Sequence, residues 1–572
     1  MAVSIQRYDG KLSAHLARIW PEASQLIFCL AVGAVTRLLA PLLQDKATDP
    51  AVVVVDAQGQ YAISLCGGHQ GGGDDLTRRV AQQLQATPII TGAAAALDLP
   101  GLDVLGRPLG WRKGAGDWTA VSAAIARHIP NAAEESGSIQ VLQTAGTTLW
   151  RSGLPTHHPF TFESDDGAAT LRITASAPTP RDRPTVYWHP RVLWLGIGCE
   201  RGTSTQVIAA AVTQALAQQN LSPLAVAGVA TLDLKADEAG LLALCRDRQW
   251  SLRCYAAPTL QQVAVPHPSA AVAQAVGTPS VAEAAALTAA ATTELLVTKQ
   301  VVRLEDAPGA ATVAVAMAEQ EFIGRTGQLW LVGTGPGALA QITPAARDAI
   351  TAADVVIGYG LYVDLVRPLL RPGQIVEALP ITQERQRAVR AIELAQWGLT
   401  VAVISSGDCG IYGMAGLVME TLEQQGWNGT SPQVEVFPGI TALQAAAARV
   451  GSPLMHDFCA ISLSDLLTPW EAIEARLQAA AAADFVTALY NPKSKTRTQQ
   501  IAIAQDIFLQ HRAPETPVAL VRSAYRHDQQ IQLTTLEQLL QHPIDMVTTV
   551  LIGNRCTRRL GDWLITPRGY LK

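Results

Sequence analysis

The amino-acid sequence predicts a multidomain α/β protein, with α/β domains in its N-terminal part and a two-lobed α/β unit at its C-terminal end. Three observations lead to this prediction. The chain has 572 residues, and domains rarely exceed roughly 200 residues. Runs with the spacing of strands and of helices alternate along most of the chain, which is typical of open α/β sheets. Glycine-rich loops follow several strands directly, at the edge where such sheets bind ligands.

The composition narrows the classes of function. Hydrophobic residues make up 48% and charged residues 16%, which is typical of a globular chain with a large core. The net charge of −5 provides no field that would attract nucleic acid. The longest apolar stretch, residues 26–35, is too short to cross a bilayer, and the first residues lack the apolar segment of a signal peptide. The eight cysteines have no CxxC spacing. We therefore expect a cytoplasmic protein without nucleic-acid or membrane partners.

Residues 1–127 are expected to form the first α/β domain. The short β-branched run AVVVV at residues 51–55 predicts a buried strand, and YAISL at residues 61–65 predicts its neighbour. The glycine-dense CGGHQGGGDDL (66–76) follows. Residues 76–85 then have the spacing of a helix, and ATPIITG (86–92) indicates another strand.

The composition changes in residues 128–190, which are rich in Ser, Thr, Pro and Gly. With only two strand-like pieces, IQVLQ (139–143) and ATLRITA (169–175), this segment is predicted to be a small irregular domain or a linker. A second α/β domain is expected over residues 191–317, beginning with the strand VLWLGIG (192–198). A turn that leads into a helix is expected within residues 273–290. Residues 318–327 form a polar join.

The alternation of predicted strands and helices begins again in residues 328–572. LWLVG (329–333) predicts a strand, and the next helix is expected to begin with Thr343 as its N-cap and Pro344 in its first turn. Further strands are expected at residues 354–360 and 400–408, with a helix after Thr382. Strand-like runs become dense after Phe485. They predict a second lobe with a mixed sheet.

The loop from Gly333 to Ala338 has the form of a dinucleotide fingerprint. However, Pro336 lacks the backbone N–H that a pyrophosphate would need. The acidic residue at the expected distance, Asp354, opens the next strand instead of closing it. A tight turn that lets a substrate approach the backbone fits better, and a nicotinamide-dependent oxidoreductase remains as an alternative.

Two more loops follow strands in the same way, one at residues 405–414 and one at residues 437–442, and LYNP (489–492) stands at a strand end. Asp408 offers an acceptor for a ribose or an amine, or else caps a helix. Because the carboxyl ends of parallel strands meet at one edge of a sheet, these loops predict a single ligand site.

The motifs VGTGPG (332–337), ISSGDCGIYG (404–413), FPGITALQAAAARVGSPL (437–454) and LYNP, in this order, resemble the tetrapyrrole methylases, the uroporphyrinogen and precorrin methyltransferase family. The run MHDFCAISLSDLLTPWEAI (455–473) resembles its precorrin-3B C17-methyltransferase branch in particular. The resemblance implies a two-lobed fold that binds S-adenosylmethionine between its lobes, a corrin precursor as substrate, and a homodimer. It leaves open whether the substrate carries cobalt. The residues that it implies for the S-adenosylmethionine site are Pro336, Ser406, Gly407, Asp408, Ile411, Tyr412, Thr441, Ala442, Asn491 and Ala524. Ala338 departs from the acidic or polar residue that many relatives have there.

Methyl transfer requires a nucleophilic carbon held in line with an activated methyl group, and little other chemistry. Ring contraction, which accompanies C17 methylation in that branch, also requires proton movements, for which His456, Asp457 and Asp465 are the candidates. Basic side chains near the cleft would pair with the carboxylates of a corrin precursor. The candidates for this pairing are Arg385, Arg387, Lys493, Arg522 and Arg526.

The N-terminal part resembles a second family, the cobalt-precorrin-5A hydrolases, from about residue 12 to residue 317. The resemblance lies in APLLQDKATDPAVVVVD (40–56), LCGGHQGGGDDLTRRVAQQL (65–84), GIGCERGTS (196–204) and VGTPSVAEAAAL (276–287). It implies opening of a lactone and release of acetaldehyde. Gly67 and Asp74 stand where the family usually has Ser and Asn, so a binding module without activity remains as an alternative.

His69 is the candidate acid or base of this part, since a histidine can give or take a proton near neutral pH. A hydrogen bond within the loop is the alternative role for its ring. Backbone N–H groups of the glycine loop would steady an oxyanion. Glu200 and Lys235 are weaker candidates. The turn expected at Gly196 to Gly198, with the residues after it, could hold a carboxylate at a helix N-terminus.

His157 and His158, followed by Glu163, Asp165 and Asp166, suggest a metal site by residue type. Their spacing matches no standard zinc or calcium loop. We therefore predict no metal site here.

Overall fold

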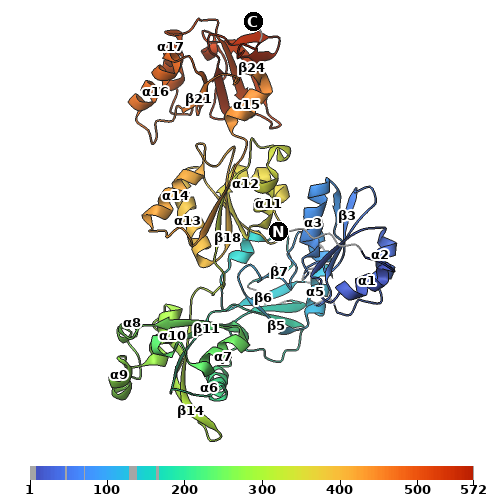
Figure 1. The fold of residues 1–572 in the computed structure, drawn as a ribbon, viewed down its shortest axis with the longest axis vertical. Helices are drawn as coiled ribbons and strands as arrows, with labels where there is room; N and C mark the ends of the chain where they lie inside the picture. The colour runs from blue at the N-terminus through green and yellow to red at the C-terminus, as the bar shows by residue number, and fades with distance from the viewer. Residues whose placement is uncertain (1–7, 46–47, 70, 128–137, 163–166, 571–572) are drawn as a thin grey trace. The chain divides into compact units, whose positions relative to one another are not determined.

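The computed structural model describes residues 8–45, 48–69, 71–127, 138–162 and 167–570 (Figure 1). The chain divides into two compact units, Met1–Gly324 and Arg325–Lys572. The first unit contains three sheets with their helices, and the second contains two lobes. Within the described ranges, no helix is both long enough and apolar enough to span a membrane.

The first domain has a four-stranded sheet in the order β1-β2-β3-β4. Strands β1 and β2 are parallel, as are β3 and β4, and β2 and β3 are antiparallel. All five residues of β2 are buried, as their β-branched run predicts. The strands are β1 (Gln25–Cys29), β2 (Ala51–Val55), β3 (Tyr61–Cys66) and β4 (Thr87–Ile89), and the helices are α1 (Leu12–Ile19), α2 (Val32–Leu39), α3 (Gly73–Leu84) and α4 (Ala93–Ala96).

The middle segment has a five-stranded sheet in the order β5-β9-β8-β6-β7, where the sequence predicted an irregular domain or a linker. Its first strand precedes residue 127, so the sheet begins before the predicted domain boundary. The strands are short and lie between loops rich in Pro and Ser, and this conceals their pattern. The elements are β5 (Arg112–Gly116), α5 (Trp118–Arg127), β6 (Ile139–Gln143), η1 (Leu149–Gly153), β7 (Phe160–Thr161), β8 (Ala169–Ile173) and β9 (Thr185–His189).

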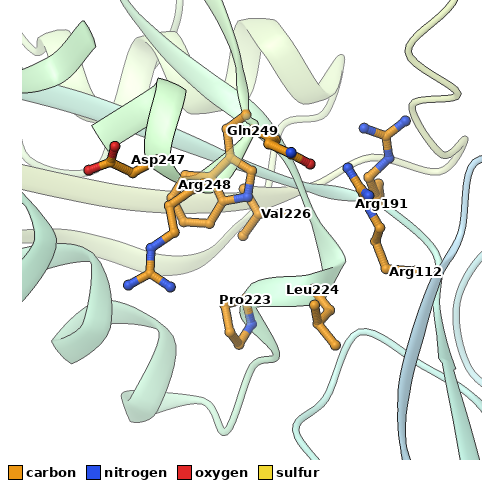
Figure 2. Close-up of a pocket in the computed structure, with 9 residues that line it drawn as sticks. Arg112, Arg191, Pro223, Leu224, Val226, Asp247, Arg248 and Gln249 are labelled. Carbon is orange, nitrogen blue, oxygen red and sulfur yellow. The ribbon is translucent and has the colours of Figure 1, made fainter. Parts of the chain in front are cut away.

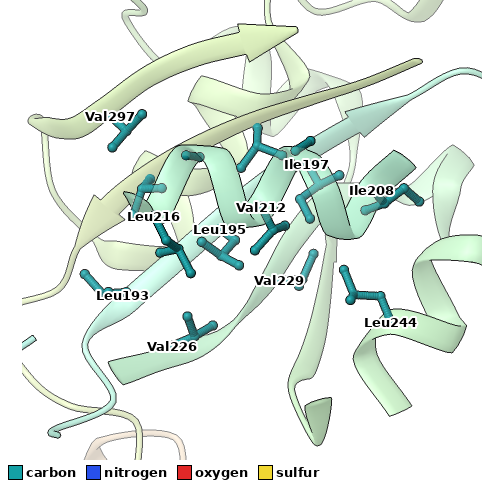
Figure 3. Packing of buried hydrophobic residues seen from close by; sticks show 14 of the residues in the cluster. Leu193, Leu195, Ile197, Ile208, Val212, Leu216, Val226, Val229, Leu244 and Val297 are labelled. Carbon is teal, nitrogen blue, oxygen red and sulfur yellow. The ribbon is translucent and has the colours of Figure 1, made fainter. Parts of the chain in front are cut away.

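The third domain has the sheet order β12-β11-β10-β14-β13. Helix α6 covers one face, where Leu195, Val212, Leu216 and Val229 belong to one buried cluster (Figure 3). The elements are β10 (Leu193–Cys199), α6 (Thr205–Gln218), η2 (Pro223–Ala225), β11 (Val226–Leu232), η3 (Asp233–Lys235), α7 (Ala239–Arg248), β12 (Ser251–Tyr255), α8 (Ala257–Gln261), α9 (Ala270–Val276), α10 (Val281–Ala290), β13 (Leu295–Leu304) and β14 (Ala307–Met317).

The prediction of a turn at Gly196 and Gly198 is wrong, because both residues lie within strand β10. A Cβ atom on Gly196 would lie 1.8 Å from the carbonyl oxygen of Ala282, in α10. Glycine is therefore required here for the helix to pack closely on the sheet, and not for a turn.

The first lobe of the second unit is a parallel sheet in the order β17-β16-β18-β15-β19. The expected start of its first helix is confirmed, because the Thr343 hydroxyl caps α11 by accepting from the N–H of Ala346 at 3.3 Å. The elements are β15 (Gln328–Gly333), η4 (Leu339–Gln341), α11 (Pro344–Ala352), β16 (Val355–Tyr359), α12 (Gly360–Val366), η5 (Arg367–Leu369), β17 (Ile375–Leu379), α13 (Glu384–Trp397), β18 (Thr400–Ser405), α14 (Met414–Gln424) and β19 (Gln433–Phe437).

The second lobe has a mixed sheet in the order β21-β22-β25-β23-β24, as predicted, beside a small sheet of β20, β27 and β26. Only β21 and β22 pair in parallel within the larger sheet. The elements are α15 (Ala442–Val450), β20 (Gly451–Ser452), β21 (Phe458–Ser462), α16 (Trp470–Ala482), β22 (Val486–Tyr490), α17 (Gln500–Leu509), β23 (Pro517–Arg522), β24 (Gln530–Thr535), η6 (Leu539–Gln541), β25 (Thr548–Ile552), β26 (Arg558–Leu560) and β27 (Trp563–Ile565).

Candidate functional site

One cavity of the second unit is lined by all ten residues that the sequence assigned to a cofactor site. It measures about 880 Å³ including its open mouth. Both lobes contribute to it. The ten residues are Pro336, Ser406, Gly407, Asp408, Ile411, Tyr412, Thr441, Ala442, Asn491 and Ala524.

The glycines of the three loops let the loops pack against one another. Gly335 and Gly407 exchange two backbone hydrogen bonds, of 3.0 and 2.7 Å. A Cβ atom on Gly439 would lie 2.1 Å from the carbonyl oxygen of Gly407. These contacts occupy the backbone that a dinucleotide fingerprint would offer to a pyrophosphate. The acidic residue of that pattern, Asp354, pairs instead with Arg325 and accepts from the N–H of Thr400.

Asp408 joins two of these loops. One carboxylate oxygen accepts from the N–H of Gly410 at 2.8 Å, and the other accepts from the N–H of Gly439 at 2.9 Å. It does not cap α14, which begins after Gly413 without a side-chain cap. A carboxylate has about four acceptor positions, so Asp408 can still accept from a ligand in the cavity.

The phenol of Tyr490 is a site group that the sequence did not single out, although the residue belongs to the LYNP motif. Its hydroxyl lies 2.6 Å from the Thr441 hydroxyl and accepts from the N–H of Leu443 at 2.7 Å. Its ring lies 5.0 Å from the ring of Tyr412. Burial raises the pKa of this phenol, so it stays protonated and holds the start of α15 against the end of β22.

Three lining residues other than glycine have left-handed backbone conformations. The φ angles are 54° at Tyr412, 50° at Asn491 and 49° at Ser523. Such conformations cost of order 1–3 kcal/mol each and persist where the surrounding structure enforces them, often at functional sites. Ser523 is a further lining residue that the sequence did not predict.

Arg526 bridges the two lobes at the cavity. Its Nε donates to the carbonyl oxygen of Pro336 at 3.0 Å, and its side chain lies where a Cβ atom on Gly337 would stand. Of the five basic residues predicted to bind carboxylates, only Arg526 lines this cavity.

The other four basic residues differ in their surroundings. Arg522 pairs with Asp528 and Asp545, each at 2.8 Å. Arg387 is buried and donates to the carbonyl oxygen of Pro380, Arg385 lines a separate hollow on α13, and Lys493 is not among the lining residues.

The three candidates for proton transfer are not among the lining residues either. The ring of His456 lies 3.5 Å from the Asp457 carboxylate, and both side chains are exposed. Asp465 accepts from the Nε2 of Gln500 at 2.8 Å. In this geometry the three belong to the segment around β21, outside the wall of the cavity.

His69 lies between two carboxylates in the first domain. Its Nε2 is 3.6 Å from Asp74 and its Nδ1 is 3.5 Å from Asp103. Asp74 also accepts from the Ser64 hydroxyl at 2.7 Å. The ring packs on Gly101, where a Cβ atom would lie 2.5 Å from it. Asp103 was not predicted, because it stands outside every motif and reaches His69 only through the fold.

The glycine loop differs from its expected role in one respect. The N–H groups of Gly73 and Asp74 donate to the carbonyl oxygens of Gly67 and Gly68, so these two donors are not free to steady an oxyanion. Gly67 has a φ of +67°, and a Cβ atom there would lie 2.7 Å from the Cα of Ala51. The serine usual at this position would therefore not fit this backbone.

The weaker candidates of the N-terminal part are engaged with neighbours in the third domain. Glu200 pairs with Arg303, and the Lys235 ammonium lies 3.7 Å from Glu238. The N–H of Gly202 donates to Glu238 at 2.7 Å. The loop predicted to hold a carboxylate thus holds one of the chain's own.

Three of the residues considered for a metal site, Glu163, Asp165 and Asp166, lie outside the described residues. In the parts of the chain that the structure does describe, no three His, Cys, Asp or Glu side chains are grouped as a metal site would need. All eight cysteines are free thiols.

Four family models match the chain. Residues 328–540 match the tetrapyrrole (corrin/porphyrin) methylases. Residues 14–95, 100–190 and 193–316 match, in turn, the models described as cobalamin synthesis G N-terminal, cobalamin biosynthesis central region and cobalamin synthesis G C-terminus.

Individual relatives match the C-terminal part. A cobalt-factor III methyltransferase of Priestia megaterium is 53% identical over 245 residues, which are 43% of this chain and 45% of that protein. A probable cobalt-factor III C(17)-methyltransferase of Salmonella typhimurium is 46% identical over 242 residues, which are 42% of this chain and 99% of that protein. Among solved structures, the methyltransferase CobJ is 39% identical with a TM-score of 0.40, over 42% of this chain and 100% of that one. The chain thus spans about half of the first relative and nearly all of the second.

Proposed function

This chain belongs to the tetrapyrrole (corrin/porphyrin) methylases, and we propose that its C-terminal unit transfers a methyl group from S-adenosylmethionine to C17 of a corrin precursor in cobalamin biosynthesis. The observation that carries the proposal is the single cavity lined by all ten predicted residues. The substrate is precorrin-3B or its cobalt-containing counterpart, and ring contraction accompanies the transfer.

The cavity suits a methyl donor of this kind by the chemistry of its walls. Asp408 supplies a negative acceptor for hydroxyl or amino groups, and Asn491 supplies an amide. Pro336, Ile411 and Ala442 supply apolar surface for a flat base. When bound, S-adenosylmethionine supplies a methyl group that is already activated on a sulfonium. The chain's own task is to orient that group toward the substrate carbon and to exclude water.

The mouth of the cavity is where the substrate would approach. Ile411 and Tyr412 line the cavity yet are 43% and 55% exposed, so they can form an apolar face for a macrocycle. Arg526 is the one cation on the wall from the predicted set, and it would pair with a substrate carboxylate. His456, Asp457 and Asp465 are proposed for the proton movements of ring contraction, since the segment that contains them resembles the C17 branch in particular.

We also propose that the N-terminal part hydrolyses the lactone of a later corrin precursor and releases acetaldehyde. Water attacks the lactone carbonyl and loses a proton, and the ring oxygen leaves and gains one. The freed alcohol then loses its proton as the bond between its carbon and the macrocycle breaks, so that acetaldehyde leaves and the macrocycle carbon keeps the electron pair and gains a proton. His69 can take the first proton and return it to the leaving oxygen. Asp74 and Asp103, each near one nitrogen of its ring, would orient the ring for these proton transfers.

The full chain, incubated with S-adenosylmethionine and each corrin precursor, tests both proposals in one mass-spectrometric experiment. We expect the product of the first reaction to gain one methyl group, and trapped acetaldehyde to accompany the second. Methyl transfer without acetaldehyde would make the N-terminal part a binding module. A reduced nicotinamide that binds in place of S-adenosylhomocysteine would revive the oxidoreductase alternative.

A homodimer that forms through the methyltransferase unit is part of the same proposal. Sedimentation of the full chain tests it directly. We expect the mass of two chains, and a monomer at all concentrations would refute it.

A further inference from the structure

A pocket in the first unit gathers three arginines that the proposed reactions do not use. It measures about 700 Å³ including its open mouth. Strand β5 lies against η2 at this place, so the middle and third domains both contribute. The lining residues are Arg112, Arg191, Pro223, Leu224, Val226, Asp247, Arg248, Gln249 and Trp250.

Arg191 is held in place by the backbone around it. Its guanidinium donates to the carbonyl oxygens of Gly110 and Ile323 and lies over the ring of Phe322. Gly110 and Gly324 both have left-handed backbones, and a Cβ atom on either would lie within 3.1 Å of the guanidinium. The chain thus uses two glycines to make room for one arginine.

The positive charge on the wall of this pocket exceeds the negative charge, because three arginines line it beside one carboxylate, Asp247. Arg112 and Arg191 lie side by side at one end of the pocket, and Arg248 comes from α7 (Figure 2). Burial and the positive charge of Arg112 lower the pKa of Arg191 to about 10. Within the described residues, none of the three arginines forms an ion pair with an acidic side chain.

The rest of the wall is mostly apolar. Pro223, Leu224 and Val226 come from η2 and the start of β11, and Trp250 precedes β12. Leu224 is 41% exposed. An apolar wall between arginine side chains suits a flat apolar molecule that carries carboxylates at its edge. The apolar wall would contact the flat face, and each guanidinium can bind a carboxylate through two parallel hydrogen bonds.

We propose that this pocket, with Arg112, Arg191 and Arg248, binds a tetrapyrrole-like macrocycle through carboxylates at its edge. The choice of macrocycle rests on the proposed function, which gives the chain polycarboxylate substrates. The pocket would hold such a molecule on the hydrolase-like unit, separately from the methyltransferase cavity.

The test uses the full chain and uroporphyrin, a stable porphyrin with carboxylates around its edge. Hydrogen exchange measured by mass spectrometry should slow in peptides that cover residues 223–226 and 247–250. The double variant Arg112→Ala, Arg248→Ala should lose this protection and bind uroporphyrin at least about tenfold more weakly, the usual scale for losing charged hydrogen bonds. Both side chains are exposed, so the fold should survive their removal.

Arg246→Ala is the matched control, because Arg246 is an exposed arginine on the same helix that does not line the pocket. It should bind uroporphyrin as the unchanged chain does. Equal protection in the double variant, or no protection in these peptides, would overturn the proposal. Protection by ATP but not by uroporphyrin would make it a phosphate site and would equally overturn it. A chain that neither transfers methyl groups nor releases acetaldehyde would refute the proposed function. The uroporphyrin experiment measures binding and not activity, so its result would still decide whether this pocket binds a macrocycle.

Discussion

At the scale of single residues, Asp408 links the shape of the cavity to its charge. Its carboxylate holds the loop after β18 to the loop after β19 through Gly410 and Gly439, and it also lines the cavity. The same side chain therefore positions two loops and offers the cavity its negative charge.

Replacing Asp408 tests this double role. Asp408→Ala should weaken the binding of S-adenosylhomocysteine to the full chain by roughly 1–3 kcal/mol, measured by calorimetry, because a charged acceptor and two loop contacts are lost. Asp408→Asn, which keeps one acceptor oxygen, should lose less. Asp364→Ala removes an exposed carboxylate on α12 and serves as the control. Equal affinity in all variants would remove Asp408 from the site.

For the hydrolase-like part, the corresponding prediction concerns His69, the candidate acid or base. His69→Ala should release acetaldehyde at least about tenfold more slowly, since general acid–base catalysis contributes more than this in most enzymes. Asp103→Asn should slow release less and should change its pH profile, because Asp103 acts through the ring of His69. Methyl transfer should be unchanged in both variants. Unaltered acetaldehyde release in His69→Ala would discard this residue while leaving the hydrolase.

The buried thiol of Cys409 should make the free energy of unfolding depend on pH. Burial raises the pKa of its thiol from 9.0 to about 11. The thiol therefore loses its proton less readily in the folded state than in the unfolded state. The contribution of the neutral thiol to the free energy of unfolding is complete below pH 9 and is lost as the pH rises toward 11. Between pH 9 and pH 11, the free energy of unfolding should fall by about 2 kcal/mol less in Cys409→Ala than in the unchanged chain, as measured by denaturant unfolding. Cys556→Ala, at an exposed thiol, should follow the unchanged chain. Identical curves for Cys409→Ala and the unchanged chain would contradict this account.

At the scale of elements, the cavity depends on three glycine loops that pack backbone to backbone. Gly439→Ala would place a Cβ atom 2.1 Å from the carbonyl oxygen of Gly407. It should lower the free energy of unfolding by about 1–3 kcal/mol, as overpacking does, and weaken S-adenosylhomocysteine binding. Thermal unfolding and calorimetry would measure the two effects.

Gly416 provides the matched control for this substitution. It is an exposed residue of α14, with open space where a Cβ atom would stand. Gly416→Ala should be neutral or stabilising, because alanine favours a helix over glycine by up to about 1 kcal/mol. If both alanine variants behave alike, close packing of the loops is not what fixes the cavity.

The sequence predicted those elements whose local pattern agrees with their final place. The buried β2, the Thr343 cap and the three loops after β15, β18 and β19 are examples. A strand that ends in a glycine-rich turn indicates both its burial and the edge where ligands bind. The ten residues that the family resemblance implied for a cofactor all line one cavity at this edge.

What the sequence could not predict depends on contacts between distant segments. Asp103 reaches His69 from 34 positions away, and the middle sheet draws β5 from before the compositional change. Gly196 looked like part of a turn because only the tertiary structure places α10 against it. His456, Asp457 and Asp465 were predicted from a segment that resembles the C17 branch, but a resemblance in sequence does not say whether a side chain faces the cavity, and none of the three lines it.

At the scale of the whole molecule, two parts of one chain match different family models. The tetrapyrrole methylase match covers residues 328–540. The two cobalamin synthesis G matches, with the cobalamin biosynthesis central region between them, cover most of residues 14–316. The boundary between the two compact units follows Gly324, so it lies between the N-terminal matches and the methylase match. Two chemistries on the same class of macrocycle would thus be carried by separate parts of one chain.

The most direct test of the central claim is the position of the transferred methyl group. The full chain would be given S-adenosylmethionine with a carbon-13 methyl group and the cobalt-free or cobalt-containing corrin precursor, and the product would be examined by NMR. The account predicts a single labelled methyl at C17 of a contracted ring. A label at any other ring position, or a product without label, would contradict it.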